Sequence, residues 1–94
     1  MAIEHRSTVD QIEIPRTGDV QVRFALEIVE GDKVHSRAWH RTTFVPGADI
    51  DQQMAFVNAH LALLGRAPVG QDDIERIKAQ ALAAWTPEVL ARER

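Results

Sequence analysis

The sequence contains no cysteine and no apolar run long enough to cross a membrane. The absence of cysteine excludes disulfide bonds and cysteine-ligated zinc, so a secreted scaffold stapled by disulfides is not expected. The longest apolar stretches, at residues 61–64 and 81–85, fall far short of the roughly 20 residues that a membrane span requires. Acidic and basic residues occupy the N-terminus, where a signal peptide needs an apolar core. We therefore expect a cytoplasmic protein that does not bind membranes.

Aromatic residues are also scarce, at 5% of the chain, whereas 45% of the residues are hydrophobic and 27% are charged. These last two proportions are ordinary for a globular protein, and 94 residues form a single domain spanning residues 1–94. The net charge of −3 provides no overall attraction to nucleic acid or to anionic lipid. Binding to such a partner would need a local basic patch.

Recognisable catalytic motifs are missing as well. Neither serine lies in a G-x-S-x-G turn, the glycines form no phosphate-binding loop, and the four histidines lack the H-x-x-x-H spacing of a metal site. The paired aspartates at 49 and 51 and at 72 and 73 precede or open expected helices, where capping explains them. The sequence thus predicts no catalytic, cofactor-binding or metal-binding residues, and no enzyme.

Alternating apolar residues predict a β-hairpin in the first half of the chain. Residues 1–11 are expected to form a flexible arm or a weak edge strand, and residues 12–14 a short strand that ends at Pro15. From residue 20 the period of two is clear, with apolar side chains at Val20, Val22, Phe24, Leu26 and Ile28. Residues 34–45 form the return strand, so the β part spans residues 12–45.

Five residues at alternate positions of segment 33–41, here called the basic set, are the candidate partner-binding site. In an extended chain alternate side chains share a face, which groups Lys33, His35, Arg37, Trp39 and Arg41. Arginine and tryptophan frequently anchor binding surfaces, because both bury a large area and still satisfy polar partners. Charged side chains that only protect an outer strand from aggregation are the simpler alternative.

The length of the turn decides which way the basic set points. A two-residue loop at Gly31 and Asp32 pairs Phe24 with Trp39 and places the basic set among the apolar residues. A three-residue loop shifts the pairing by one and turns the set outward. We favour the three-residue loop, because it buries fewer charges.

Helical periodicity takes over in the second half, residues 49–92. A stripe of Ile50, Met54, Val57, Leu61 and Leu64 predicts a first helix, with Asp49 and Gln52 capping its start, Gly65 ending it, and Phe56 and Leu63 widening the buried stripe. A second helix is expected from about Asp72, its N-cap, to Ala84, with Ile74, Ile77, Ala81 and Leu82 facing inward. Thr86 and Pro87 predict a short third helix.

Two segments carry a family resemblance. The hairpin leading into HRTTFVPGADI (residues 40–50), together with WTPEV (residues 85–89), resembles small uncharacterised proteins encoded in bacteriophage and prophage tail regions. That family has no established activity, so the resemblance implies context only: virion assembly or an accessory role through protein contacts.

The sequence therefore predicts an α+β domain, with a hairpin that can extend to three strands, then two helices and a short C-terminal helix. The functional expectation is a non-enzymatic, phage-derived structural or accessory protein, located in the host cytoplasm or on the virion. It would bind another protein or itself, without a cofactor. The alternative is a small nucleic-acid-binding protein that uses strand 33–41, with basic side chains on phosphates and Trp39 stacked on a base.

Overall fold

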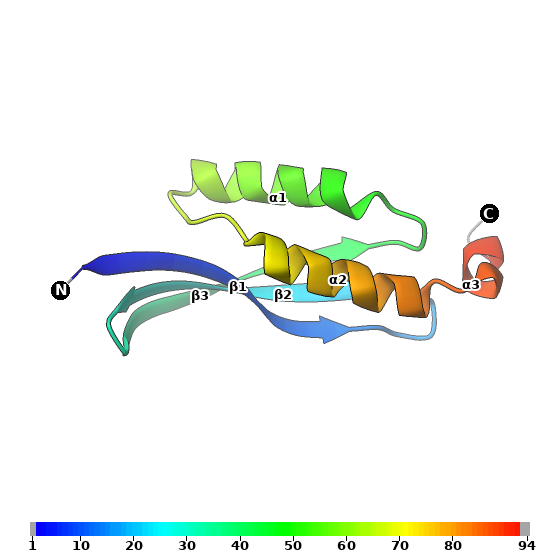
Figure 1. Cartoon of the computed structure of the whole chain (residues 1–94), viewed down its shortest axis with the longest axis horizontal. Helices are drawn as coiled ribbons and strands as arrows, with labels where there is room; N and C mark the ends of the chain where they lie inside the picture. Colours follow the sequence, from blue (N-terminus) through cyan, green and yellow to red (C-terminus); the bar gives the residue numbers. More distant parts are fainter. Residues whose placement is uncertain (1, 93–94) are drawn as a thin grey trace.

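The computed structural model describes residues 2–92 and has an α+β fold, as predicted (Figure 1). A three-stranded antiparallel sheet with the order β1-β2-β3 is followed by two helices and a short terminal one. The elements are β1 (Ile3–Glu13), β2 (Val20–Glu30), β3 (Lys33–Phe44), α1 (Ile50–Leu63), α2 (Gln71–Ala84) and α3 (Pro87–Arg92). No helix in this part of the chain is both long and apolar enough to span a bilayer.

The first strand is longer than the sequence suggested. Of the two alternatives for the first eleven residues, the edge strand is correct and the arm is wrong: residues 3–13 form one continuous strand paired with β2, with a bulge between Val9 and Gln11. Two contacts hold β1 from its other side: Ser7 bridges to Val69 in the α1–α2 loop, and the Val9 N–H donates to an Asp73 carboxylate oxygen at 3.0 Å. These contacts come from residues more than 60 positions away, so local sequence could not indicate them.

Both long helices cover the same face of the sheet and enclose the core with it (Figure 1). The sheet contributes Val9, Val20, Val22, Phe24, Leu26 and Phe44, and the helices contribute Ile50, Met54, Val57, Leu61, Ile74, Ile77 and Ala81. This set contains the predicted β2 alternation except Ile28, and the predicted helical stripes except Leu64 and Leu82. No helix formed by residues 2–92 lies on the opposite face of the sheet, which is here called the open face.

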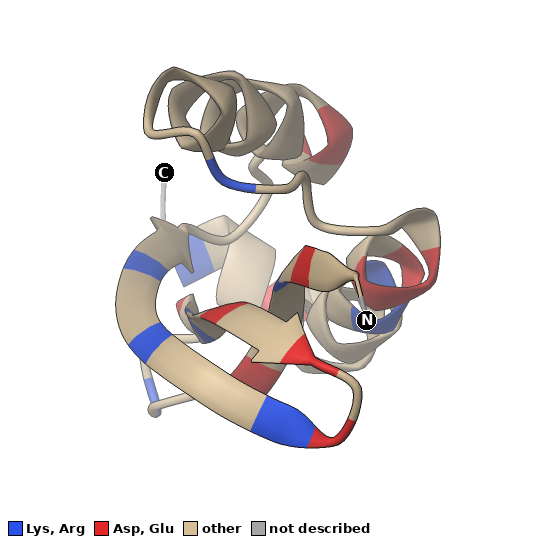
Figure 2. Ribbon diagram, turned by 90° about the vertical axis from the view of Figure 1, so that its left-hand side faces the viewer, with Lys and Arg blue, Asp and Glu red and all other residues tan. Residues whose placement is uncertain are grey.

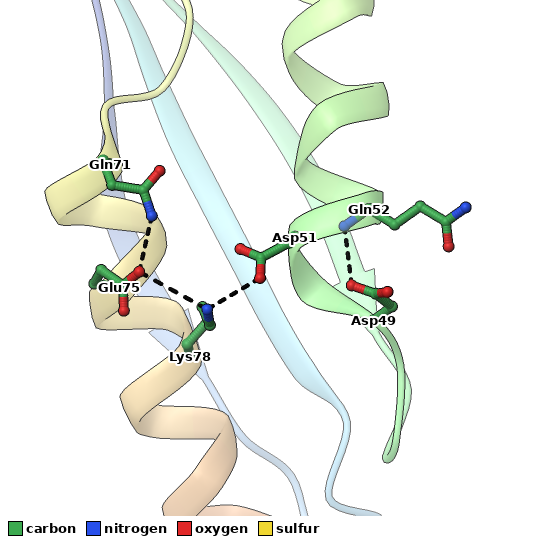
Figure 3. Close-up of polar contacts among 6 residues, drawn as sticks. All are labelled: Asp49, Asp51, Gln52, Gln71, Glu75 and Lys78. Carbon is green, nitrogen blue, oxygen red and sulfur yellow. Dashed lines mark hydrogen bonds and ion pairs between the residues drawn. The ribbon is translucent and has the colours of Figure 1, made fainter.

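Helix α1 begins and ends where the sequence predicted. An Asp49 carboxylate oxygen accepts from the Gln52 N–H at 3.1 Å (Figure 3). At the other end Gly65, at φ +73°, forms a Schellman motif, in which its N–H and the next N–H bond back to Ala62 and Leu61. Helix α2 differs from prediction: it begins at Gln71 with Gly70 as N-cap, so Asp72 lies in the first turn.

Four apolar side chains of the helical part that were expected in the core lie outside it. Phe56 and Leu63 on α1 are 69% and 86% exposed, Leu64 at the C-cap of α1 is 54% exposed, and Leu82 on α2 is 81% exposed. The prediction that Leu64 completes the buried stripe is therefore wrong. Helix α1 reaches the core only through the stripe of Ile50, Met54, Val57 and Leu61. The prediction that Phe56 and Leu63 widen the buried stripe is wrong, because α1 lies over the sheet with its far side uncovered.

Polar contacts join the two long helices at the surface. Lys78 Nζ on α2 lies 3.0 Å from an Asp51 oxygen in the first turn of α1 and 3.8 Å from an oxygen of Glu75 (Figure 3). The hydrogen bond to Asp51, followed by the charges of Asp51 and Glu75, raises the pKa of Lys78. On α2 itself, the Gln71 amide donates to Glu75 at 2.8 Å.

The C-terminal junction closes one end of the domain. Thr86 caps α3, accepting from the Val89 N–H at 3.3 Å, as the sequence predicted. The Trp85 indole N–H donates to the Gly18 carbonyl oxygen at 2.7 Å, which ties the helices to the β1–β2 turn. Gly18 has φ +89°, and a Cβ at this position would lie 2.5 Å from Val89. Glycine is therefore required there both for its backbone conformation and for space.

Candidate functional site

A bulge in the β2–β3 hairpin sets the orientation of the basic set. The loop has two residues, because Glu30 pairs with Lys33 across Gly31 and Asp32, so the favoured three-residue loop is wrong. The register then shifts by one between Ile28 and Val29, leaving His35 as the extra residue on β3. Beyond this bulge Trp39 pairs with Ala25 instead of Phe24. The bulge therefore turns Trp39 away from the core, which is the effect that the three-residue loop was expected to have.

The five residues of the basic set are divided between the two faces. Arg37, Trp39 and Arg41 pair with Glu27, Ala25 and Arg23, and all six lie on the open face. Lys33 pairs with Glu30, on the same side as the core residues of β2. His35 also contacts Glu30, with its Nε2 3.1 Å from a Glu30 carboxylate oxygen. The single face predicted for all five residues is therefore wrong for Lys33 and His35.

Trp39 is the central side chain of the open face. It is 48% exposed, although its cross-strand neighbour Ala25 is only 5% exposed. The guanidinium carbon of Arg23 lies 4.5 Å from the centre of the indole ring, and that of Arg37 lies 5.8 Å from it. Both distances are within the range of cation–π attraction, so the ring is held between two cations.

Acidic side chains fix these two arginines in turn. Arg23 contacts Asp10 at 2.6 Å, and Arg37 contacts Glu27 at 2.7 Å, while Arg6 approaches Glu27 at 3.8 Å. Sequence reasoning missed Arg6, Asp10 and Arg23. The alternation of β2 was a usable signal for Arg23, but the two β1 residues gave no signal because their segment was expected to be an arm.

The open face is close to electrically balanced. Pairing and register place four arginines and four carboxylates on it: Arg6, Arg23, Arg37 and Arg41 with Glu4, Asp10, Glu13 and Glu27. Within residues 2–92, Arg41 makes no ion pair. Arg41 and Arg23 line a polar hollow of about 290 Å³ together with Glu13 and Gln21.

A second polar cluster, on the core side of β3, was not predicted. The ring centres of His40 on β3 and His60 on α1 lie 5.7 Å apart, and Phe24 stacks on His40 at 6.3 Å. Burial, and secondarily the charge of His60, lowers the pKa of His40. Across residues 2–92, no group of three or more histidine, aspartate or glutamate side chains is arranged to hold a metal ion. The contact depends on the docking of α1, so strand and helix periodicity alone could not predict it.

Comparisons with protein-family models, curated proteins and solved structures give no match to this chain. The likeness to phage and prophage tail-region proteins therefore stays a proposal.

The chemistry of the open face suits a protein surface better than a phosphate backbone. Phosphate binding requires cations whose charge is available to the nucleic acid. Here Asp10 and Glu27 already engage Arg23 and Arg37. A half-exposed aromatic ring next to two ion-paired arginines has the composition that is typical of a protein–protein hot spot and its polar rim.

Proposed function

We propose that this protein is a non-enzymatic assembly or accessory component that binds a different protein through the open face of its sheet. The observation that carries the proposal is the position of Trp39, half-exposed and held between Arg23 and Arg37. A ring that is already ordered loses little conformational entropy on binding, so its burial is converted efficiently into affinity.

The partner is expected to present a pocket for the indole, with polar groups around it. Arg41 offers the one guanidinium of the open face that makes no ion pair within the described residues, so a carboxylate beside the indole pocket would complete the match. The resemblance to tail-region proteins favours a phage or prophage structural protein as this partner, in the host cytoplasm or on the virion.

Affinity capture with two variants tests the proposal. Trp39→Ala removes the ring, and Arg41→Glu reverses the charge that lacks an ion pair; Arg16→Glu, an exposed arginine in the β1–β2 turn, is the matched control. The partner captured by the wild-type chain and by the control should be lost from both open-face variants. Equal capture by all four chains would contradict the proposal.

A filter-binding titration with DNA and RNA at low and moderate salt distinguishes nucleic-acid binding, the alternative function, from protein binding. Phosphate contacts produce a steep fall in affinity with salt, with a slope of about −0.9 per contact on duplex DNA. The balanced charge of the open face predicts no such binding. Retention of nucleic acid with a slope that Arg41→Glu reduces would favour the alternative function.

A further inference from the structure

Two histidines from different elements face each other beside the core. His40 on β3 pairs with Phe24 of β2, so its ring lies on the core side of the sheet. His60 lies in the last turn of α1, and the two ring centres are 5.7 Å apart. Within residues 2–92 no protein group forms a hydrogen bond with either imidazole, so their nitrogen lone pairs are available to a ligand.

The distance between the rings fits a metal ion that both imidazoles bind. With Zn–N bonds of about 2.05 Å and a nitrogen about 1.15 Å from its ring centre, two imidazoles at the tetrahedral angle have centres about 5.2 Å apart. The observed 5.7 Å differs from this value by only about half an ångström. The exposed side chain of His60 can close this difference by a small rotation. The angle between the ring planes sets no limit, because an imidazole can rotate about its metal–nitrogen bond.

One of the two ligands is already held in place. Phe24 is completely buried and stacks on His40 with the ring centres 6.3 Å apart, which restricts the imidazole. A side chain that is ordered before binding loses little conformational entropy when it takes a ligand. His60 is exposed, so an ion can reach the pair from solvent.

The electrostatic surroundings of the pair suit a cation. The last turn of α1, which contains His60, is the negative end of the helix dipole. Helix α1 has no lysine or arginine, and Figure 2 shows its ribbon free of basic residues. Arg37 and Arg41, the cations nearest to His40 along β3, lie on the open face, on the other side of the sheet.

We propose that His40 and His60 together bind one transition-metal ion, Zn²⁺, Ni²⁺ or Cu²⁺, although the spacing of the histidines in the sequence predicted no metal site. Imidazole nitrogen suits these ions, whereas Mg²⁺ and Ca²⁺ prefer oxygen ligands. Because the described residues supply no group of three or more such ligands, water or a donor from another molecule fills the remaining positions. We therefore expect a dissociation constant on the order of 10–100 µM at neutral pH, far weaker than that of a four-ligand zinc site. The ion would link β3 to α1 on the side of the sheet opposite Trp39.

Isothermal titration calorimetry at about pH 7.5, where imidazole is neutral, tests the site. The wild-type chain should bind one Zn²⁺ or Ni²⁺ ion and no Mg²⁺, and His40→Gln and His60→Gln should each weaken binding at least about tenfold. His5→Gln and His35→Gln, which replace the other two histidines, are the matched controls and should bind like the wild type. Circular dichroism confirms that each variant is folded. Absence of binding at about 1 mM ion would overturn the proposal, as would unchanged binding by His60→Gln or equal weakening by all four variants.

The link between β3 and α1 provides a second test. An ion that binds only the folded chain raises its unfolding temperature. At about 1 mM Ni²⁺ the Tm of the wild-type chain should rise by roughly 5 °C or more over its value in EDTA, and the Tm of His60→Gln should not change. No rise in the wild type, or the same rise in both chains, would contradict a metal ion held by these two histidines.

Discussion

Trp39 lies directly opposite Ala25 on the open face of the sheet, and the bulge at His35 is what places it there. The small side chain of Ala25 leaves room for the indole, and the arginines on either side hold the ring in place. Without this bulge the two-residue loop would pair Trp39 with Phe24, on the core side of the sheet, so the candidate binding site depends on how β3 accommodates one extra residue.

Deleting His35 should leave the fold intact. The deletion removes only the bulged residue, so the turn pairing of Val29 with Val34 and the pairing of Ala25 with Trp39 both remain. Deleting Ala38 instead would turn Arg37 or Arg41 toward the core and should cost more than about 3 kcal/mol. Urea denaturation gives both free energies of unfolding. Equal destabilisation by the two deletions would contradict the assigned register.

Alanine substitutions at Gly18 and Gly65 distinguish the cost of backbone strain from the cost of a steric clash. Both have positive φ, but only at Gly18 would an added Cβ meet Val89, whereas nothing lies within 4 Å at Gly65. Gly65→Ala should cost about 1–2 kcal/mol of unfolding free energy from backbone strain alone. Gly18→Ala should cost more, and a second change, Val89→Ala, should recover part of the difference. No recovery in the double variant would refute the close approach of α3 to this turn.

The two histidines that face each other should make stability depend on pH. The pKa of folded His40 lies below its ordinary value of 6.5, through burial and then through the charge of His60. Below pH 6.5 the unfolded chain binds more protons than the folded chain, so this contribution to stability is complete above 6.5 and is lost as the pH falls. Urea midpoints across this range should fall less steeply for His60→Gln. An unchanged slope would show that His60 does not act on His40.

Neighbouring positions on α2 should respond very differently to substitution. Ile77 is completely buried, so Ile77→Ala should cost about 2–5 kcal/mol through lost burial and the cavity left behind. The Lys78 side chain is 38% exposed, and Lys78→Met should leave the unfolding free energy nearly unchanged, despite its contact with Asp51. Thermal unfolding of the two variants measures this contrast. A large loss in Lys78→Met would mean that the ion pair between the helices is a main source of stability.

The elements that the sequence predicted are those whose periodicity is set by the core. The apolar periodicity of β2 and α1 follows directly from which residues are buried, and Asp49 and Thr86 act through local capping geometry. No sequence pattern indicated the bulge at His35, because both loop lengths were compatible with the alternation of apolar residues. The length of strand β1 was underestimated because the strand buries only Ser7 and Val9.

The error at Phe56 and Leu63 has a different origin. An apolar side chain on a helix predicts burial, but the pattern does not say whether the same chain or another one covers it. In this structure the core covers only one stripe of α1.

The central claim, that Trp39 anchors a protein partner, is tested most directly by quantitative affinity capture from the cells that produce the protein. The comparison is between the wild-type chain and Trp39→Ala, with both chains shown to be folded by circular dichroism. We predict that one protein is captured by the wild-type chain and that its recovery falls at least about tenfold with the variant. Identical recovery with the two chains would contradict the account.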